Sequence, residues 1–433
     1  MLAFLLVQLY NSSDISERRS DIVNIDCHIP PKREMWGKQL MGGKRVKSGI
    51  LAKRYWRDKS TPMGQVDELA KYSDDVINLS LGDPDLCTDE SIIQGAFADA
   101  LAGHTKYTDF RGDPELRQAI AEFYQQEYGM LVDDSEIFVT AGGCIAMYLA
   151  LEAILDDGDE VIMQAPYFTP YLQQIELARG IPVELPTYEE EGFQINFERL
   201  QALTNERTRA IIINSPSNPT GSVMSQDTME RLCKYAKQND IVVISDDIYT
   251  AFSYQEPFIP IAKFDGMRER TVTINSFSKN YTMTGWRVGN IIAPQILIKT
   301  IQQINENLTF TVSSVSQRAA ICAIHNRKSF QPALIEEYRK RTYYAASRIN
   351  RIPGMSVLEP PMGTFYLFAN IKRTGLSSAQ VCDIMLREAH VLAIPGNSFG
   401  DCGEGYVRFC CTVDIPTLKT AFDRLEQIPI FQK

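Results

Sequence analysis

The sequence predicts an α/β protein with a large three-layer αβα domain around a mainly parallel sheet, plus a smaller α+β domain. The chain has 433 residues, and a single hydrophobic core rarely grows past about 250–300 residues, so two domains are expected. From about residue 76, short β-branched runs alternate with amphipathic stretches, which favours a parallel sheet with helices on both faces. After about residue 312, long helical stretches precede a few strands, which indicates the smaller domain.

The strands of the larger domain are predicted where a run is apolar almost throughout, because strands covered on both faces have no solvent side. Such runs occupy residues 136–140, 160–164, 209–214, 241–246, 271–276 and 287–293. Helices are predicted between them at residues 114–128, 144–155, 225–238 and 294–305. We assign residues 106–311 to this domain.

The smaller domain is predicted from residues 61–105 and 312–433. Helices are expected at 313–325 and 332–350, and strands at 364–371 and 406–412. A last helix has a plausible N-cap at Asp414 and carries Pro416 in its first turn. Its apolar face consists of Ile415, Leu418, Phe422 and Leu425.

Residues 1–60 are predicted to form an N-terminal extension that is partly disordered. They contain 12 Lys or Arg and 6 Asp or Glu, which is typical of a solvated arm, and the alternative is an arm that packs on a partner subunit. The apolar start MLAFLLVQLY is too short to span a bilayer and lacks the basic region and cleavage site of a signal peptide. We therefore expect a cytoplasmic protein without a membrane partner.

Composition argues against other classes of function. The net charge of −10 disfavours general nucleic-acid binding, because neutralising phosphates needs an excess of Lys and Arg. The nine cysteines are odd in number and form no CxxC pair, which favours a reduced, cytosolic chain. The four histidines are scattered without metal-ligand spacing, so no metal site is expected.

Two loops that follow predicted strands suit a bound phosphate. In open α/β sheets, ligands bind at the carboxyl ends of strands. The turn Ala141-Gly142-Gly143-Cys144 opens a helix, so its backbone can approach a ligand and its free N–H groups favour an anion. The run Ser276-Phe277-Ser278-Lys279, with Arg287 eight residues after the lysine, suits a Schiff base beside that phosphate. Taken singly, these are a tight turn and a surface lysine.

Two further loops place polar groups at the same edge of the sheet. Asn218 lies in the Pro-punctuated turn that follows the strand 209–214. Asp246 follows the apolar run 241–244, where a carboxylate is costly to bury unless it meets a cation. Taken singly, the first is a plain turn and the second a helix cap.

In this order, the four loops resemble those of the class I/II aminotransferases of the pyridoxal-phosphate-dependent fold-type I superfamily. The motifs are the Gly-Gly turn, Asn-Pro-Thr-Gly at 218–221, Ser-Asp-Asp-Ile-Tyr at 245–249, and Ser-Phe-Ser-Lys at 276–279 with Arg287. The resemblance covers roughly residues 76–430. It implies that the large domain binds pyridoxal 5′-phosphate.

The resemblance also implies a role for each cofactor-binding residue. Lys279 would bind the cofactor as a Schiff base, and Asp246 would pair with the pyridinium nitrogen. Asn218 and Tyr249 would hydrogen-bond the phenolic oxygen of the ring. An aromatic side chain is expected on the ring at Phe168. The phosphate would be held by Gly143, Cys144, Ser276, Ser278 and Arg287, together with Tyr107 from a neighbouring subunit, which implies a homodimer.

On the substrate side, the resemblance implies Gly82, Asn218 and Arg408. Arg408 would hold the substrate α-carboxylate, which suits the planar fork of a guanidinium. Cys144 departs from the family pattern, in which bacterial relatives place a lysine for the distal carboxylate of acidic substrates, or Ser or Thr for the phosphate. The preference for acidic, neutral or aromatic amino acids is therefore left open.

The expected activity is transfer of an amino group between an L-amino acid and a 2-oxo acid, with 2-oxoglutarate as the expected acceptor, by a ping-pong mechanism. Lys279, Asp246 and Tyr249 are the expected catalytic residues. One alternative is a C–S β-lyase on the same fold. Another is a pyridoxal-phosphate-binding transcriptional regulator, which residues 1–75 disfavour because they show no helix-turn-helix pattern.

Overall fold

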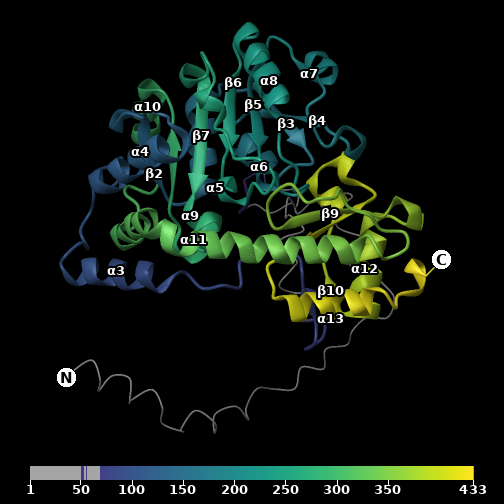
Figure 1. Ribbon diagram of the computed structural model, residues 1–433. Helices are drawn as coiled ribbons and strands as arrows, with labels where there is room; N and C mark the ends of the chain where they lie inside the picture. Colours follow the sequence, from purple (N-terminus) through teal and green to yellow (C-terminus); the bar gives the residue numbers. More distant parts are fainter. Residues whose placement is uncertain (1–49, 53–54, 56–68, 433) are drawn as a thin grey trace, which may run out of the picture. The chain divides into compact units, whose positions relative to one another are not determined.

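The computed structural model describes residues 50–52, 55 and 69–432 (Figure 1). The chain divides between residues 35 and 36, and every feature described below belongs to the second part. The extension predicted over residues 1–60, with its alternative of an arm on a partner subunit, lies almost entirely outside the described residues and stays a prediction.

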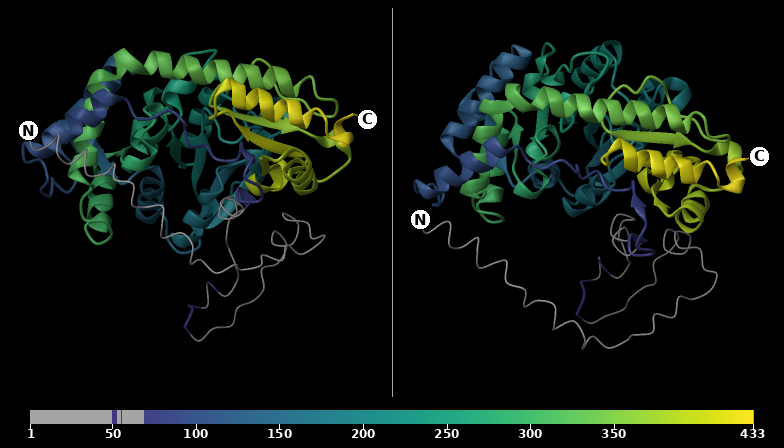
Figure 2. Two further views of the ribbon diagram at one scale, coloured as in Figure 1. Left: turned by 90° about the horizontal axis from the view of Figure 1, so that it is seen from below. Right: turned by 60° about the horizontal axis from the view of Figure 1, so that its bottom comes forward.

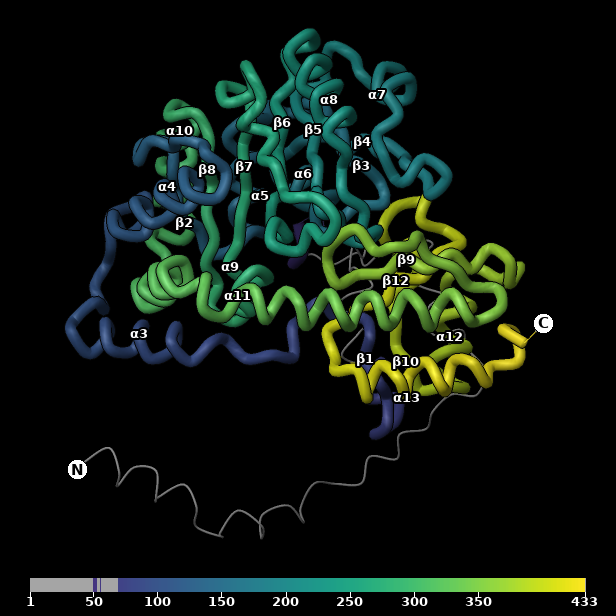
Figure 3. Tube along the Cα trace, in the orientation of Figure 1, coloured from purple at the N-terminus to yellow at the C-terminus, as the bar shows by residue number. Residues whose placement is uncertain are grey.

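The largest of the three sheets in the part of the chain that the structure describes has seven strands (Figure 3). Its strands lie in the order β2-β8-β7-β6-β5-β3-β4, and only β8 runs antiparallel to its neighbours. The strands are β2 (Ile137–Thr140), β3 (Glu160–Ala165), β4 (Ile181–Pro186), β5 (Thr208–Asn214), β6 (Val242–Asp246), β7 (Thr271–Ser276) and β8 (Gly289–Ile292). The predicted mainly parallel sheet is confirmed. The edge strand β4 was missed, because two prolines and a glutamate hide its strand pattern.

Helices cover both faces of this sheet. Alternate residues of β5 enter opposite cores, with Ile212 in one and Ile211 in the other, as the period of two in a strand requires. One face carries α5 (Gly143–Ile154), α6 (Pro170–Leu177) and α10 (Gln295–Asn305). The opposite face carries α4 (Pro114–Tyr128), α7 (Phe197–Leu203) and α8 (Gln226–Gln238). Helix α3 (Glu90–Leu101) joins the same core by packing on α11 (Ser314–Ile349). The predicted three-layer αβα arrangement is therefore confirmed.

Two smaller sheets bring distant segments of the chain together. β1 (Ile77–Asn78) pairs in parallel with β10 (Val391–Leu392). β12 (Tyr406–Cys410) lies antiparallel to β11 (Ile394–Pro395) and β9 (Tyr366–Asn370). The Cys410 amide donates to the Leu79 carbonyl at 2.8 Å, so the segment after β1 runs beside β12. The predicted division into a small domain of residues 61–105 and 312–433 and a large domain of residues 106–311 stays a prediction.

The prediction of two helices at 313–325 and 332–350 was wrong, because one helix, α11 (Ser314–Ile349), continues through Pro332 (Figure 2). A proline in a helix removes one N–H donor but keeps a helical φ. Packing offsets that loss, since α11 contacts α3 and α4 as well as α13 (Ile415–Leu425) and β9. The predicted last helix is α13, where the Asp414 side chain accepts from the Thr417 amide at 2.9 Å. A further helix, α12 (Ser378–Ala389), was not predicted.

Among the described residues, no helix combines the length and the apolar character that crossing a membrane requires. Within the same part of the chain, no three His, Cys, Asp or Glu side chains are grouped so that they could hold a metal ion.

Candidate active site

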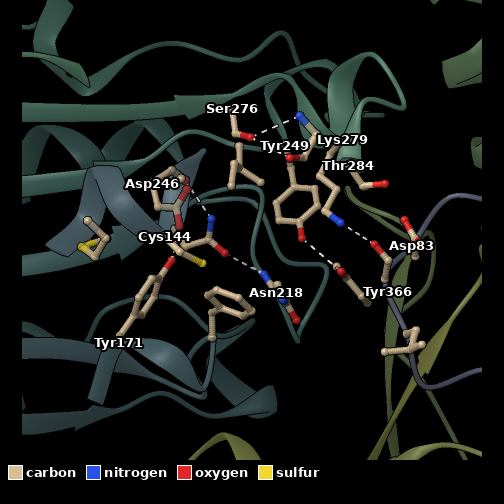
Figure 4. Close-up of a pocket in the computed structure, with 18 of the residues that line it drawn as sticks. Asp83, Cys144, Tyr171, Asn218, Asp246, Tyr249, Ser276, Lys279, Thr284 and Tyr366 are labelled. Atoms are coloured by element: carbon tan, nitrogen blue, oxygen red, sulfur yellow. Dashed lines mark hydrogen bonds between the residues drawn. The ribbon is translucent and has the colours of Figure 1, made fainter. Parts of the chain in front are cut away.

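A pocket of about 290 Å³ opens where β5, β6 and β7 end (Figure 4). Asn214, Asp246 and Ser276, the last residues of these strands, all line it. The pocket also brings together every predicted site residue except Tyr107. These are Gly82, Gly143, Cys144, Phe168, Asn218, Asp246, Tyr249, Ser276, Ser278, Lys279, Arg287 and Arg408.

One side of the pocket has the features of an anion site. Helix α5 begins after Gly142 without a side-chain cap, so amides of its first turn keep their donors free of a capping side chain. A Cβ on Gly142 would lie 2.6 Å from Arg287 Nη2, which shows how closely the guanidinium approaches this turn. The hydroxyls of Ser276 and Ser278 are 2.9 Å apart on the same side of the pocket. Positive charge, hydroxyls and a helix N-terminus thus meet at one place.

Asp246 lines the same pocket as a buried carboxyl group, 6% exposed. Its Oδ2 accepts a hydrogen bond from the Tyr171 hydroxyl, whereas Oδ1 is buried without a hydrogen-bond partner. Burial raises the pKa of Asp246 to about 6, although the bond from Tyr171 and the backbone amide of Ile248 both lower it. A buried carboxylate oxygen without a partner is costly, so Oδ1 is suited to a donor or cation that enters the pocket.

Asn214 connects Asp246 to the next loop. Its side-chain amide donates to the Asp246 carbonyl at 2.8 Å, and its Oδ1 accepts from the Asn218 amide at 2.8 Å. The Asn218 side chain in turn accepts from Arg408 Nη1 at 2.9 Å. Arg408 is 2% exposed, and its guanidinium lies over the rings of Tyr366 and Phe399. This chain of contacts fixes the amide of Asn218 and the fork of Arg408 at the edge of the pocket.

Lys279 lines the same pocket as the anion site and Arg408. Its ammonium donates to the carbonyl of Gly82, which lies just after the segment that runs beside β12. Burial lowers the pKa of Lys279 to about 8, with help from the charges of Arg408 and Arg287 and against the opposing effect of Asp83 and Cys410. A larger fraction of neutral amine is therefore present near neutral pH, as a nucleophile or proton acceptor requires.

Tyr107 is the predicted site residue that the pocket does not contain. Its side chain is 81% exposed, and its ring packs edge-on against Phe310 at 5.0 Å between centroids. The expected role was on a neighbouring subunit, so its place outside the pocket of its own chain does not contradict that role.

Nine lining residues were not predicted from the sequence, and three of them make the polar contacts that matter here. Asn214 ends β5, Tyr171 lies in the first turn of α6, and Tyr366 begins β9. A signal for Tyr171 was present, because it follows the candidate Phe168 by three residues in a turn in which the Tyr171 amide donates to the Phe168 carbonyl at 3.1 Å. The position of Tyr366 depends on the pairing of β9 with β12, which no local pattern reveals.

The geometry is that of an α/β protein whose pocket holds a buried lysine of lowered pKa, an arginine and a helix N-terminus. Comparisons with known proteins agree. Residues 74–425 match the family described as aminotransferase class I and II. An aspartate aminotransferase of Pyrococcus abyssi is 39% identical over 366 residues, covering 83% of this chain and 93% of that protein. An aromatic-amino-acid aminotransferase of Thermococcus litoralis is 37% identical over the same coverage.

Solved structures give the same result. The chain is similar to aspartate aminotransferase from Thermus thermophilus with maleate, with a TM-score of 0.83, 30% identity, and coverage of 88% of this chain and 100% of that one. It is also similar to an aromatic aminotransferase from Pyrococcus horikoshii, with a TM-score of 0.80, 37% identity, and coverage of 84% and 98%. The chain belongs to the class I and II aminotransferases, and the resemblance inferred from its motifs is confirmed. It is an enzyme that transfers an amino group between an amino acid and a 2-oxo acid.

Proposed function

We propose that the pocket binds pyridoxal 5′-phosphate through Lys279 and transfers amino groups by a ping-pong mechanism, with 2-oxoglutarate as acceptor. One observation carries the proposal. A single pocket is lined by a lysine of lowered pKa, by an uncapped helix N-terminus with Arg287, and by Asp246 with its unpartnered Oδ1. A phosphate and a protonated ring nitrogen are the two ends of one molecule that would satisfy both of these groups.

The residues present fit this cofactor at each end. The first turn of α5 and Arg287 offer donors and positive charge for a phosphate. Asp246 Oδ1 lacks a partner in a desolvated place, as the acceptor for a pyridinium N–H should. Asn218 and Tyr249 border the space between these ends and carry groups that can donate to the phenolic oxygen. Phe168, at the same pocket, is suited to contact the ring face.

When bound, the cofactor supplies a ring that accepts the electron pair released as the substrate Cα–H bond breaks. Asp246 keeps a proton on the ring nitrogen, because a carboxylate in a desolvated site favours the charged partner. Lys279 Nζ would take the proton from the substrate Cα and deliver it to the cofactor carbon that bonds the transferred nitrogen. Its pKa of about 8 suits both directions near neutral pH.

The substrate α-carboxylate would bind Arg408, whose planar fork matches two carboxylate oxygens. The contact from Asn218 and the two flanking aromatic rings hold this fork in one orientation. A fixed orientation directs the Cα–H bond toward Lys279 and lowers the entropy cost of the reaction. Gly82 lines the same pocket, and its missing side chain leaves room for the Tyr366 hydroxyl.

The proposal includes a homodimer in which Tyr107 reaches the phosphate of the neighbouring subunit, and a cytoplasmic location. Support for the dimer comes from an exposed aromatic group in which the rings of Tyr107 and Phe110 both pack edge-on against Phe310. Exposed aromatic patches are typical of interaction surfaces. Sedimentation of the purified chain measures the mass, and a Tyr107→Phe variant that keeps wild-type cofactor affinity would contradict the role of this tyrosine.

A single-turnover panel tests the activity. The cofactor-loaded protein is mixed with single amino acids and no acceptor, while absorbance and products are followed. One equivalent of 2-oxo acid per site, with the cofactor left in its amino form, supports the proposal, and the fastest donor names the substrate class. Pyruvate and ammonia accumulating beyond one equivalent would instead support the C–S β-lyase. In Lys279→Ala we expect cofactor binding without turnover, and substantial residual transfer would contradict the role of this lysine.

A further inference from the structure

Tyr366 is a buried tyrosine that lines the pocket, and none of the roles above uses its hydroxyl group. It is 3% exposed, and its hydroxyl lies 3.0 Å from the hydroxyl of Tyr249 (Figure 4). The Arg408 guanidinium lies over its ring, 4.7 Å from the centroid. One side chain therefore contacts both the group proposed for the cofactor oxygen and the group proposed for the substrate carboxylate.

The backbone opposite Tyr366 is shaped to admit its hydroxyl. A Cβ on Gly82 would lie 1.8 Å from the Tyr366 hydroxyl oxygen, far inside van der Waals contact. Any side chain at residue 82 would therefore displace this hydroxyl. The carbonyl of Gly82 also accepts from Lys279, so the glycine brings the lysine and the tyrosine pair to the same side of the pocket.

The order of hydrogen bonds follows from the number of protons. A tyrosine hydroxyl has one proton and two acceptor lone pairs. If Tyr249 donates its proton to the ring oxygen of the cofactor, its own oxygen can only accept from Tyr366. Burial raises the pKa of both tyrosines, so both hydroxyls keep their protons at working pH. The direction is then Tyr366 to Tyr249 to the cofactor oxygen.

We propose that Tyr366 is a positioning residue: its hydroxyl orients the Tyr249 proton toward the cofactor, and its ring holds the Arg408 fork for the substrate carboxylate. This inference rests on the proposed function, because it assumes a cofactor oxygen at Tyr249. It assigns separate tasks to the two parts of one side chain, so two substitutions can separate them.

Removing the hydroxyl has a predictable electrostatic effect. A hydrogen-bond donor to the ring oxygen of the cofactor stabilises the negative charge on that oxygen. The oxygen then holds the proton on the Lys279 nitrogen less firmly. Without Tyr366 the Tyr249 donor is less well aligned, and the pKa of that proton rises. The charged and titratable groups around the tyrosine pair and Lys279 are unchanged by the substitution. They are Asp83, Asp246, Arg287, Arg408 and Cys410.

Tyr366→Phe tests the hydroxyl. The visible absorbance of the cofactor-loaded protein is titrated with pH, and the pKa of the transition is expected to rise by roughly 0.5–1 unit, from the net value of one hydrogen bond. We expect kcat to fall several-fold, and KM for the amino acid to stay near the wild-type value because the ring is kept. Tyr366→Leu removes the ring as well, and KM should then rise together with the spectroscopic pKa.

The matched control is Tyr235→Phe. Tyr235 is a buried residue of α8 outside the pocket, and its hydroxyl donates to Thr204 Oγ1 at 2.7 Å. This variant should leave the spectroscopic pKa unchanged. An unchanged pKa in Tyr366→Phe would overturn the role of the hydroxyl, and equal KM values in the Phe and Leu variants would overturn the role of the ring. If wild-type protein binds no cofactor at Lys279, the proposed function itself fails, and that result is distinguishable because no visible transition is then seen.

Discussion

Replacing Lys279 by methionine should stabilise the cofactor-free protein at neutral pH and lose that effect at alkaline pH. Burial lowers the pKa of Lys279 from 10.5 to about 8, and at 1.36 kcal/mol per pKa unit this is on the order of 3 kcal/mol. Below pH 8 both the folded and the unfolded chain carry the charge, so the folded state bears the full cost of burying it. Between pH 8 and 10.5 the unfolded state binds more protons, and stability rises with pH.

The assay is urea unfolding of protein freed of cofactor with hydroxylamine, at pH 7 and pH 10.5 and at equal protein concentration. The free energy of unfolding of Lys279→Met should exceed that of wild type by up to about 3 kcal/mol at pH 7, and by much less at pH 10.5. The lost hydrogen bond to Gly82 lowers the gain at both values. Lys299→Met, on the exposed side of α10, is the control. An equal gain at both pH values would refute the reasoning.

Three further outcomes are expected. Asp246→Ala should lower kcat/KM by about 10²–10³, the typical loss of one preorganised electrostatic partner, and near-normal turnover would contradict its role. Gly142→Ala should weaken cofactor affinity in a fluorescence titration, because the new Cβ meets Arg287 Nη2 at 2.6 Å and the residue has a φ of 93°; unchanged affinity would place the phosphate elsewhere. Cys144→Lys should raise kcat/KM for aspartate relative to phenylalanine by roughly tenfold, as one added charge-assisted contact can; an unchanged ratio would show that the distal group binds away from residue 144.

The sequence predicted the large sheet well because its signal is local. Buried parallel strands such as β6 are apolar runs, and a polar residue at the end of such a run, as at Asp246, lies at a sheet edge by topology alone. The turn at Gly143 and the lysine at Lys279 could be found in the same way. All of these residues line one pocket.

What was missed depends on contacts between distant segments. The place of Tyr366 follows from the register in which it pairs with Cys410, and a strand pattern gives a face but no partner. A second helix was predicted to begin at Pro332, whereas α11 continues through this proline. The packing of α11 on α3, α4, α13 and β9 that offsets the lost donor is not visible in the sequence. The edge strand β4 was not predicted for a related reason. Its two prolines argue against a strand in the sequence, and they are tolerated only because β4 lies at the edge of the sheet.

The pairing of β5 with β6 sets Asn214 opposite Asp246. Cofactor binding would therefore depend on the correct register of these two strands. A slip of β6 by one residue would turn the carboxyl to the other face of the sheet, and a slip by two would move it by about 6.6 Å along the strand. Either error leaves the helices and most of the apolar burial intact, so far-ultraviolet circular dichroism would hardly detect it. Uptake of the chromophore therefore reports whether refolding chains have reached the native strand alignment, and the visible absorbance separates correctly aligned molecules from compact misaligned ones.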